Sequence, residues 1–391
     1  MSGIWKLTLA HARHHRVRSA LLIACIALSA WLPATVQTLF VRYRDGLSLR
    51  AAATPMVVGP RGNRFDLTLG ALYFRESRLD PVPFSVHREL TREEELKSVP
   101  LHTGFGARGR PLVGTTPDYY SVRGLVASQG ELPLWLGDAV LGSSVASSLG
   151  LGPGDTLFTD AVELYDISQP PSLELNVVGV LARSGTPDDD AVFVDVKTCW
   201  LVAGLLHGHV DVAEEGVLPE GFELSRTESS VSVSPALIEH QRVTDQNREE
   251  FHLHEEEDDM PLSAVLVFPS TKKAGTLFQT RLNQEGELQA LTPRLVVADL
   301  LSFVFRIKRF LDVVAMMLLA TTVLFTGLVL WLSTRLRAEE FRVLDAMGCA
   351  RWTVVRLAGG EVVLLAALGL GLAALGLGAT LGWLPDLVRA L

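Results

Sequence analysis

The sequence predicts a membrane protein, in which an α-helical bundle of three spans carries a large extracytoplasmic α+β domain of two lobes. Three uncharged stretches, residues 19–41, 313–334 and 362–385, are the main observation. As helices that rise about 1.5 Å per residue, each can cross about 30 Å of hydrocarbon. One early span, a long polar insert and two late spans predict that the chain couples an event outside the membrane to one inside it.

The charges divide at the same boundaries. Residues 44–305 carry 21 Lys and Arg against 38 Asp and Glu, a net charge of −17. The remaining residues carry 14 against 6, a net charge of +8. An insert this acidic repels the phosphate backbone of nucleic acid, so we expect no nucleic-acid partner. The insert is long enough to bury a core of its own.

The flanks of the spans predict the orientation. Four basic side chains and no acidic one precede the first span: Lys6, Arg13, Arg16 and Arg18. The positive-inside rule then places the N-terminus in the cytoplasm and the insert in the periplasm, with the chain in the inner (cytoplasmic) membrane. Residues 335–356, with five Arg against three acids, return to the cytoplasm. Three cations at 306–309 fall on the outer side, but long translocated domains follow this rule only weakly.

The first span is interpreted as an uncleaved helix. Its apolar run exceeds the roughly 7–15 residues of a signal-peptide core, and no small-residue cleavage site follows it. Pro33 is expected to kink this helix.

These observations divide the chain into seven segments. They are a cytoplasmic N-terminus (1–18), a first span (19–41), the extracytoplasmic domain (42–305), a stalk end with the second span (306–334), a cytoplasmic coupling segment (335–361), a third span (362–385) and a C-terminal tail (386–391).

The hydrophobic pattern of the insert predicts a mixed α/β domain. One lobe is expected around residues 125–200, the other from the flanking sequence, and a long acidic surface excursion over residues 213–262. The expected strands are 112–114, 176–180, 191–196 and 264–268, and the expected helices are 143–149 and 273–283.

Motifs for catalysis are missing from the sequence. It has no phosphate-binding Gly-Lys-Ser/Thr loop, no Gly-x-Ser-x-Gly elbow and no His-Glu-x-x-His pair. Residues 104–109 spell Gly-x-Gly-x-x-Gly, but Pro111 follows at once, so we interpret them as a turn. We therefore expect a non-catalytic subunit without a cofactor.

Two histidine pairs are weak candidates for a metal site. His252 and His254 stand beside five consecutive carboxylates, and His207 and His209 form a second pair. Imidazole and carboxylate suit zinc or copper. The favoured alternative is a solvated acidic loop that binds no metal.

The segment between the second and third spans carries the strongest signal. It is typical of two short amphipathic helices, broken at Gly348, that lie along the membrane face. This segment resembles that of the MacB/FtsX/LolC-type permeases of ABC transport systems, which have an Arg/Glu-rich helix, an Ala-Leu-Gly-Ala-Ser turn and a basic helix. Here the turn is Ala-Met-Gly-Cys-Ala at 346–350. Residues 139–157 and 175–187 resemble the outer domain of the same family, which has a MacB-like periplasmic domain.

The resemblance implies a homodimer or heterodimer of permeases and a separate cytoplasmic ABC ATPase that binds the coupling segment. It also implies mechanotransmission to the outer domain, in export or in lipoprotein and lipid handling, with membrane lipids and a possible periplasmic partner. Such permeases usually have a fourth span, so here either another chain supplies it or this chain is a reduced or truncated member of the family. The ATPase-coupling residues are Glu339, Glu340, Phe341, Leu344, Met347, Gly348 and Arg351.

Gly371, Gly378 and Gly382 in the third span have the small-residue spacing that permits close helix packing. They are equally typical of a membrane helix that tolerates glycine.

Two other functions stay open at this point. One is a non-transporting membrane regulator of a periplasmic enzyme, and the other is a metal-responsive membrane receptor.

Overall fold

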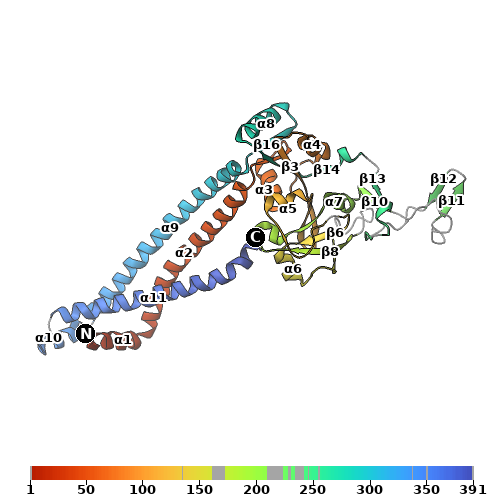
Figure 1. Ribbon diagram of the computed structural model, residues 1–391. Coiled ribbons are helices and arrows are strands. Elements are labelled where there is room, and N and C mark those ends of the chain that lie inside the picture. The colour runs from red at the N-terminus through yellow and green to blue at the C-terminus, as the bar shows by residue number, and fades with distance from the viewer. Residues whose placement is uncertain are drawn as a thin grey trace. The chain divides into compact units, whose positions relative to one another are not determined.

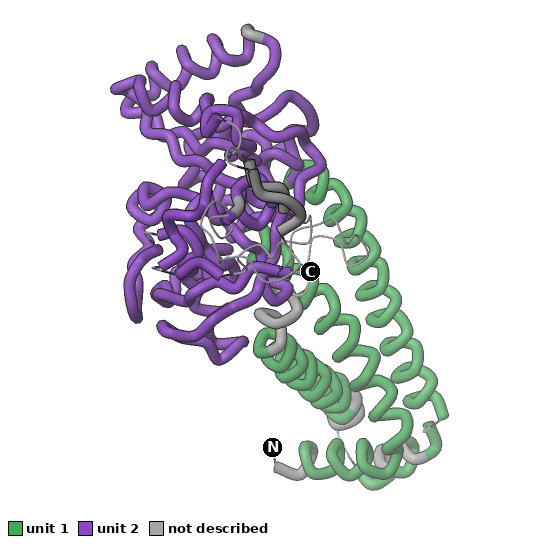
Figure 2. Tube along the Cα trace, turned by 90° about the vertical axis from the view of Figure 1, so that its right-hand side faces the viewer, with its two compact units in different colours: residues 1–45, 301–391 green, residues 46–300 purple. Residues whose placement is uncertain are grey.

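The computed structural model of the chain describes residues 2–133, 135–160, 172–208, 223–227, 230–233, 242–244, 246–253, 256–336, 338–348 and 351–389. Contacts divide the chain into two compact units (Figure 2). The helical unit comprises Met1–Asp45 and Leu301–Leu391, and the α/β unit comprises Gly46–Leu300.

Five helices supply the helical unit: α1 (Ser2–His14), α2 (Arg16–Ala52), α9 (Pro293–Leu336), α10 (Ala338–Ala346) and α11 (Arg351–Arg389). The last residues of α2 and the first of α9 belong to the α/β unit. Among the described residues, three helices are long and apolar enough to cross a membrane. A window of 18 residues has a mean hydropathy of 2.0 in α2, 2.4 in α9 and 2.4 in α11. The expectation of three long apolar helices is confirmed, and α2 continues through Pro33.

The surface of α9 is apolar over the stretch that the sequence assigned to the second span. Its exposed side chains there are Val313, Val314, Met316, Met317, Leu318, Leu319, Val323, Leu324, Phe325, Leu328, Trp331 and Leu332. A helix that is apolar on most of its sides is stable when its surroundings are apolar as well.

Small residues let α11 approach α2 closely. A Cβ atom added at Gly369 would lie 2.7 Å from Cγ2 of Ile26, and one added at Gly376 would lie 3.1 Å from the indole ring of Trp31. At Gly371, Gly378 and Gly382 such an atom would meet no described atom within 4 Å. The close contacts of α11 with α2 are thus at Gly369 and Gly376, which were not among the glycines expected to pack. A contact of the other three with a further helix stays a prediction.

Ten strands of the described residues form one mixed sheet in the α/β unit (Figure 1). They are β1 (Met56–Pro60), β3 (Leu96–Ala107), β4 (Arg110–Thr115), β5 (Ala127–Gly130), β6 (Asp138–Leu141), β7 (Thr156–Phe158), β8 (Glu174–Leu181), β9 (Val192–Asp195), β15 (Ala264–Pro269) and β16 (Leu288–Leu291). Their order is β16, β1, β15, β3, β4, β9, β6, β8, β5, and β7 pairs with β8 beside this path.

Most pairs of strands are antiparallel, but β4 with β9 and β6 with β8 are parallel. Strands β16, β1, β15 and β3 come from the two ends of the unit's sequence, and the rest come from its middle. The hairpin of β3 and β4 joins the two groups. The two expected lobes therefore correspond to two halves of one sheet path within a single compact unit.

Alternation along the strands buries both faces of the sheet. In β15, Val265 and Val267 belong to one hydrophobic cluster, while Ala264 and Leu266 belong to the other. This follows from the strand geometry, which points successive side chains to opposite faces. The helices of this unit are α3 (Arg64–Tyr73), α4 (Phe84–Thr91), α5 (Asp118–Arg123), α6 (Ser143–Leu149), α7 (Val196–Val202) and α8 (Lys272–Glu285).

The strands and helices expected from the sequence are confirmed. The helix over 143–149 is α6, and it ends at Gly150, which has φ of +68° as the left-handed cap of a helix requires. Of the residues that spell Gly-x-Gly-x-x-Gly, 104–107 belong to β3, and only Arg108 and Gly109 form the expected turn. It joins β3 to β4 through Arg108 (φ +51°) and Gly109 (φ +69°), two positive φ values that match the right-handed twist of a hairpin.

The acidic excursion of residues 213–262 lies partly outside the described residues. Its described part contributes short strands to three two-stranded ladders: β10 (Leu206–Gly208) with β13 (Phe251–Leu253), β11 (Glu223–Thr227) with β12 (Ser230–Val233), and β14 (Pro261–Leu262) with β2 (Val82–Pro83). Three short 3₁₀ turns complete the unit: η1 (Pro187–Asp190), η2 (Arg248–Glu250) and η3 (Glu257–Asp259).

Candidate functional site

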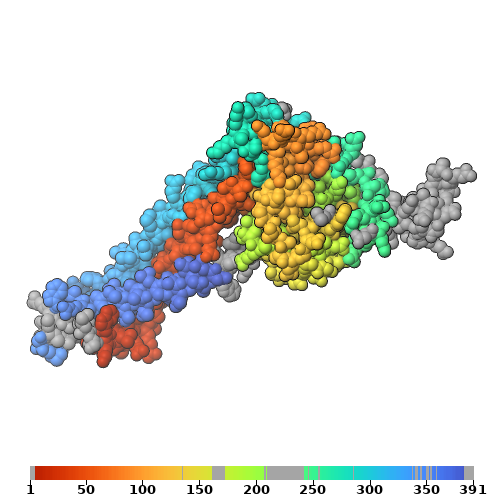
Figure 3. Space-filling model, in the orientation of Figure 1, coloured from red at the N-terminus to blue at the C-terminus, as the bar shows by residue number. Residues whose placement is uncertain are grey.

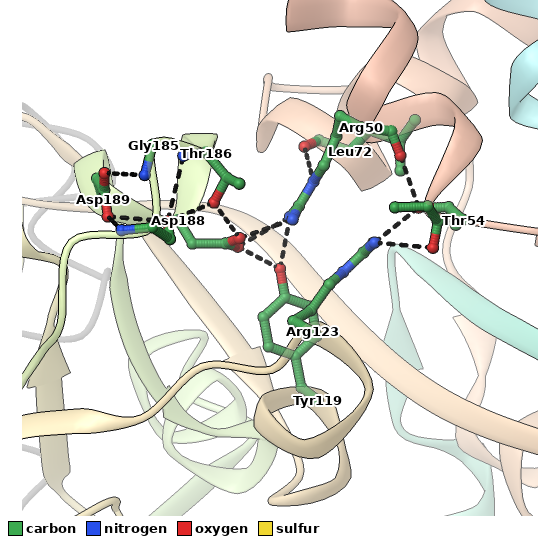
Figure 4. A network of polar contacts seen from close by, with 11 residues as sticks. Arg50, Thr54, Leu72, Tyr119, Arg123, Gly185, Thr186, Asp188 and Asp189 are labelled. Atoms are coloured by element: carbon green, nitrogen blue, oxygen red, sulfur yellow. Dashed lines mark hydrogen bonds and ion pairs between the residues drawn. The ribbon is translucent and has the colours of Figure 1, made fainter.

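The last turn of α2 is fixed in the α/β unit by a buried arginine. Arg50 is 5% exposed, and its Nη1 and Nη2 donate to the two carboxylate oxygens of Asp188 at 2.6 and 2.8 Å. Nη2 also donates to the Tyr119 hydroxyl at 2.7 Å, and Nε donates to the Leu72 carbonyl at 3.2 Å. Figure 4 shows these groups pointing toward one another. The bidentate geometry is the strongest form of an Arg–carboxylate contact.

The carboxylate partner belongs to the turn η1, between β8 and β9. Asp188 is 1% exposed and also accepts hydrogen bonds from Tyr119 at 2.5 Å and from Thr186 at 2.7 Å. The neighbouring Asp189 accepts from the backbone N–H of Ser184 and of Gly185, each at 2.8 Å. The turn, which connects β8 to β9, is thereby held by hydrogen bonds of its own side chains.

Packing at this turn leaves no room for a side chain beside it. At Gly142, which caps α6, an added Cβ would lie 2.3 and 2.4 Å from the carbonyl oxygens of Asp188 and Asp189. Glycine is required there because backbone meets backbone.

The electrostatics keep this network charged. Burial by itself would raise the pKa of Asp188, but the Arg50 guanidinium and the hydrogen bonds from Arg50, Tyr119 and Thr186 hold that pKa below its usual range. Burial raises the pKa of the Tyr119 phenol above its ordinary value, so the phenol stays protonated and can donate. A second arginine, Arg123, contacts Thr54 with its Nη1 at 2.8 Å from the hydroxyl oxygen.

The first turn of α2 carries a second arginine pair, in the helical unit. The Arg18 guanidinium is paired with the Glu361 carboxylate of α11 and donates to the Ser333 hydroxyl of α9. Nε2 of His11, on α1, lies 3.1 Å from Nη2 of Arg18 and 3.7 Å from Oε2 of Glu361. Glu361 is 6% exposed. One polar cluster therefore joins four helices of this unit.

The coupling segment is broken at Gly348 as predicted, but its second helix is not a separate short one, because it is the start of the 39-residue helix α11 that contains the third apolar stretch. Helix α10 ends at Ala346, Gly348 has φ of +84°, and α11 begins at Arg351. Positive φ is favourable for glycine and strained for residues with a Cβ atom. The turn is therefore specified by this residue.

Apolar side chains of this segment are exposed. Val343 on α10 is 59% exposed, and Met347, which directly follows the end of α10, is 68% exposed. The backbone N–H of Met347 still donates to the Val343 carbonyl at 3.0 Å. On α11, Trp352 is 70% and Val355 is 58% exposed. Glu339 is also exposed. The side chains of Glu340, Phe341, Leu344 and Arg351 lie outside the described residues, so their coupling role stays a prediction.

Of the four candidate metal ligands, the structure describes only part. The register of β10 and β13 places His207 opposite His252, and Nδ1 of His252 lies 3.0 Å from the Glu250 carbonyl oxygen. His209, His254 and the side chain of His207 lie outside the described residues. Among the described side chains, no group of three or more His, Cys, Asp or Glu could hold a metal ion.

Sequence analysis missed both arginine pairs. For Arg18 with Glu361 there was a usable signal, since Glu361 stands alone at the start of an apolar span and Arg18 stands at the start of another. For Arg50 with Asp188 there was none, because nothing along the chain relates residues so distant in sequence. The Thr186-Pro-Asp-Asp sequence signals only a turn.

Two solved structures are similar to this chain. The periplasmic region of MacB from Actinobacillus actinomycetemcomitans aligns with 64% of this chain and 94% of its own length, at 11% identity and a TM-score of 0.37. The extracellular domain of the noncanonic ABC-type transporter YknZ from Gram-positive bacteria aligns with 60% and 98%, at 11% identity and a TM-score of 0.34. Both names agree with the resemblance seen in the sequence. No protein-family model and no curated protein sequence matches the chain. Both TM-scores lie below 0.5, so neither likeness assigns a function to this chain.

Proposed function

We propose that this chain is the permease subunit of an ABC transport complex in the inner membrane. It couples ATP hydrolysis by a separate cytoplasmic ATPase to movement of its periplasmic α/β unit, and it is not itself an enzyme. The work of the complex would be export, or the handling of lipoproteins and lipids at the cell envelope.

This proposal rests on the length of α2 and on the contacts at its two ends. It is one helix of 37 residues, about 55 Å long at about 1.5 Å per residue, so it exceeds the roughly 30 Å of a hydrocarbon core. Each end of it bears an arginine paired with a carboxylate from another element, Arg18 with Glu361 and Arg50 with Asp188. A continuous helix that is fixed at both ends transmits a displacement along its axis, whereas a flexible connection would absorb it.

The coupling segment supplies the cytoplasmic input. Val343 on α10, Met347 directly after it and Trp352 on α11 are exposed, and they form apolar surface that a partner can bury. The resemblance of this segment to that of ABC permeases favours an ATPase as this partner. When two ATPases close on ATP, their coupling segments would draw together, and α2 and α9 would carry the motion to the two outer domains of a permease dimer.

Co-purification tests the docking step. We expect the intact protein, extracted from its native membrane, to retain an ABC ATPase identified by mass spectrometry. Met347→Asp should lose it, since the change buries an unpaired charge in the interface. Met347→Leu conserves volume and apolar character and should retain it. Equal yields of ATPase with Met347→Asp and with the wild type would contradict the docking assignment.

A further inference from the structure

A groove between α2 and α9 in the helical unit has no role in the coupling just described. Its volume is about 470 Å³. The residues that line it are Gln37, Phe40, Val41 and Arg44 of α2, and Ser302, Phe305, Lys308, Arg309 and Asp312 of α9. Figure 3 shows the two helices (orange-red and light blue) lying along each other.

The groove lies where two apolar spans end on the same side. Its α2 residues are the last of the first apolar stretch and those just after it, and its α9 residues come just before the second. That level of a membrane-crossing helix is the headgroup region. Tyr43, which is 43% exposed, lies in the same part of α2, and tyrosine is a residue type that favours the membrane–water interface.

The lining carries an excess of positive charge. Lys308 is paired with Asp312, whose Oδ2 is 2.5 Å from Nζ, and Arg44 is paired with Asp45 at 2.7 Å. Asp312 and both members of the Arg44 pair are 40–52% exposed, so these pairs contribute little and can be exchanged for a stronger anion. Arg309 forms no ion pair with any described residue. Three cations therefore face one lining carboxylate.

The floor of the groove is apolar. The rings of Phe40 and Phe305 meet edge to face with their centroids 5.0 Å apart, and Nζ of Lys308 lies 5.6 Å from the centroid of Phe40. Aromatic carbon below a cationic rim is complementary to a molecule with an anionic head and an apolar body.

We propose that this groove binds the phosphate headgroup of an anionic membrane lipid. Arg44 and Arg309 receive the phosphate oxygens, and the glycerol and upper acyl chain lie on Phe40 and Phe305. Arginine suits this role because its planar fork of donors matches phosphate geometry. The assignment rests on the membrane placement in the proposed function, and it gives a reason for the cations at 306–309 that run against the positive-inside rule.

The test measures lipid binding to the purified full-length chain in detergent. The probes are dihexanoyl phosphatidylglycerol, dihexanoyl phosphatidylcholine and inorganic phosphate, each titrated against intrinsic fluorescence. We expect phosphatidylglycerol to bind at least about tenfold more tightly than phosphatidylcholine, a difference of about 1.4 kcal/mol. The variant R44Q/R309Q should lose this preference. Equal affinities for the two lipids, or inorganic phosphate binding as tightly as phosphatidylglycerol, would overturn the assignment.

Two controls keep the result interpretable. R306Q removes a cation that does not line the groove, and it should keep the preference within about threefold. R44K/R309K keeps the charges and should retain part of the preference, which separates loss of charge from loss of fold. If R306Q abolishes the preference as fully as R44Q/R309Q does, binding is a general surface effect and the groove is not the site. No ATPase takes part in this measurement, so its failure leaves the coupling proposal untouched.

Discussion

The two ends of α2 hold the same kind of contact in different surroundings. Arg50 and Asp188 have side chains that are 4% and 1% exposed, and every hydrogen-bonding nitrogen of Arg50 has a partner. Arg18 is 22% exposed beside Glu361 at 8%, and its buried Nε has no hydrogen-bond partner among the described residues. Helix α2 is therefore fixed more completely in the α/β unit than in the helical unit. Under the proposed function, this difference would let the first turn of α2 shift while its last turn stays fixed to the α/β unit.

Breaking the Arg50 pair should have the largest effect on stability. D188A leaves a buried guanidinium without its carboxylate, and such a loss typically costs about 3–5 kcal/mol. We expect a lower thermal midpoint for the full chain in detergent, measured by circular dichroism.

The exposed pair of Arg64 and Asp299 provides the matched control. Their side chains are 50% and 55% exposed, so R64A should cost less than about 1 kcal/mol. If R64A and D188A lower the thermal midpoint equally, the buried Arg50 network contributes no more to stability than an exposed ion pair does.

Acid should weaken the α/β unit through His102. Burial lowers the pKa of this side chain from its ordinary value of 6.5 to about 4, and no described residue pairs with its Nε2. Below about pH 6.5 the imidazole of His102 is therefore protonated in the unfolded chain, whereas in the folded chain it stays neutral down to about pH 4. Stability falls over this window as pH falls, by up to about 3 kcal/mol.

The variant H102Q removes this titration. Unfolding midpoints of the full chain measured between pH 7 and pH 4 should fall less in H102Q than in the wild type. Parallel pH profiles would show that His102 is not the cause. The lowered pKa of Asp188 acts in the same direction, but only at a more acidic pH, below the ordinary aspartate range.

Breaking the Arg18 pair should have a smaller effect on stability than D188A. R18Q leaves the Glu361 carboxylate without its cation, and we expect a loss of about 1–3 kcal/mol because solvent reaches the arginine. The double variant R18Q/E361Q removes both charges and should recover part of the loss. A double variant less stable than R18Q would mean that Glu361 is stabilised by groups other than Arg18.

Local patterns explain which parts of the fold were predictable. The spans follow from uninterrupted apolar sequence, and α6 follows from its helix spacing and from Gly150 as its cap. Gly348 was predicted to break the helix because a glycine between two amphipathic patterns is a local signal. It can be recognised without knowledge of contacts elsewhere in the fold. The single sheet path was not predictable, since it depends on β3 pairing with both β4 and β15, which are far apart in sequence.

The candidate sites also differ in how far the local sequence predicts them. Exposure of Met347 follows from its place at the end of an amphipathic helix, and the backbones of His207 and His252 do lie opposite each other. Arg50 and Asp188 are 138 residues apart in sequence. An arginine that follows an apolar span is expected to be an ordinary exposed cation of the flanking sequence. Only the folded chain shows that it is the most completely satisfied charge on α2.

If α2 transmits ATP-driven motion to the α/β unit, as proposed, the distance between the two outer domains of a permease dimer should respond to ATP. A spin label at K273C, in a C25S/C349S background, reports the separation of the two outer domains in a permease dimer bound to its ATPase. We predict that ATP shifts this distance in the otherwise wild-type protein. In D188N, which disrupts the grip on Arg50, ATP should be hydrolysed without that shift. An equal ATP-dependent shift in D188N, or no shift in the protein that retains Asp188, would contradict the account.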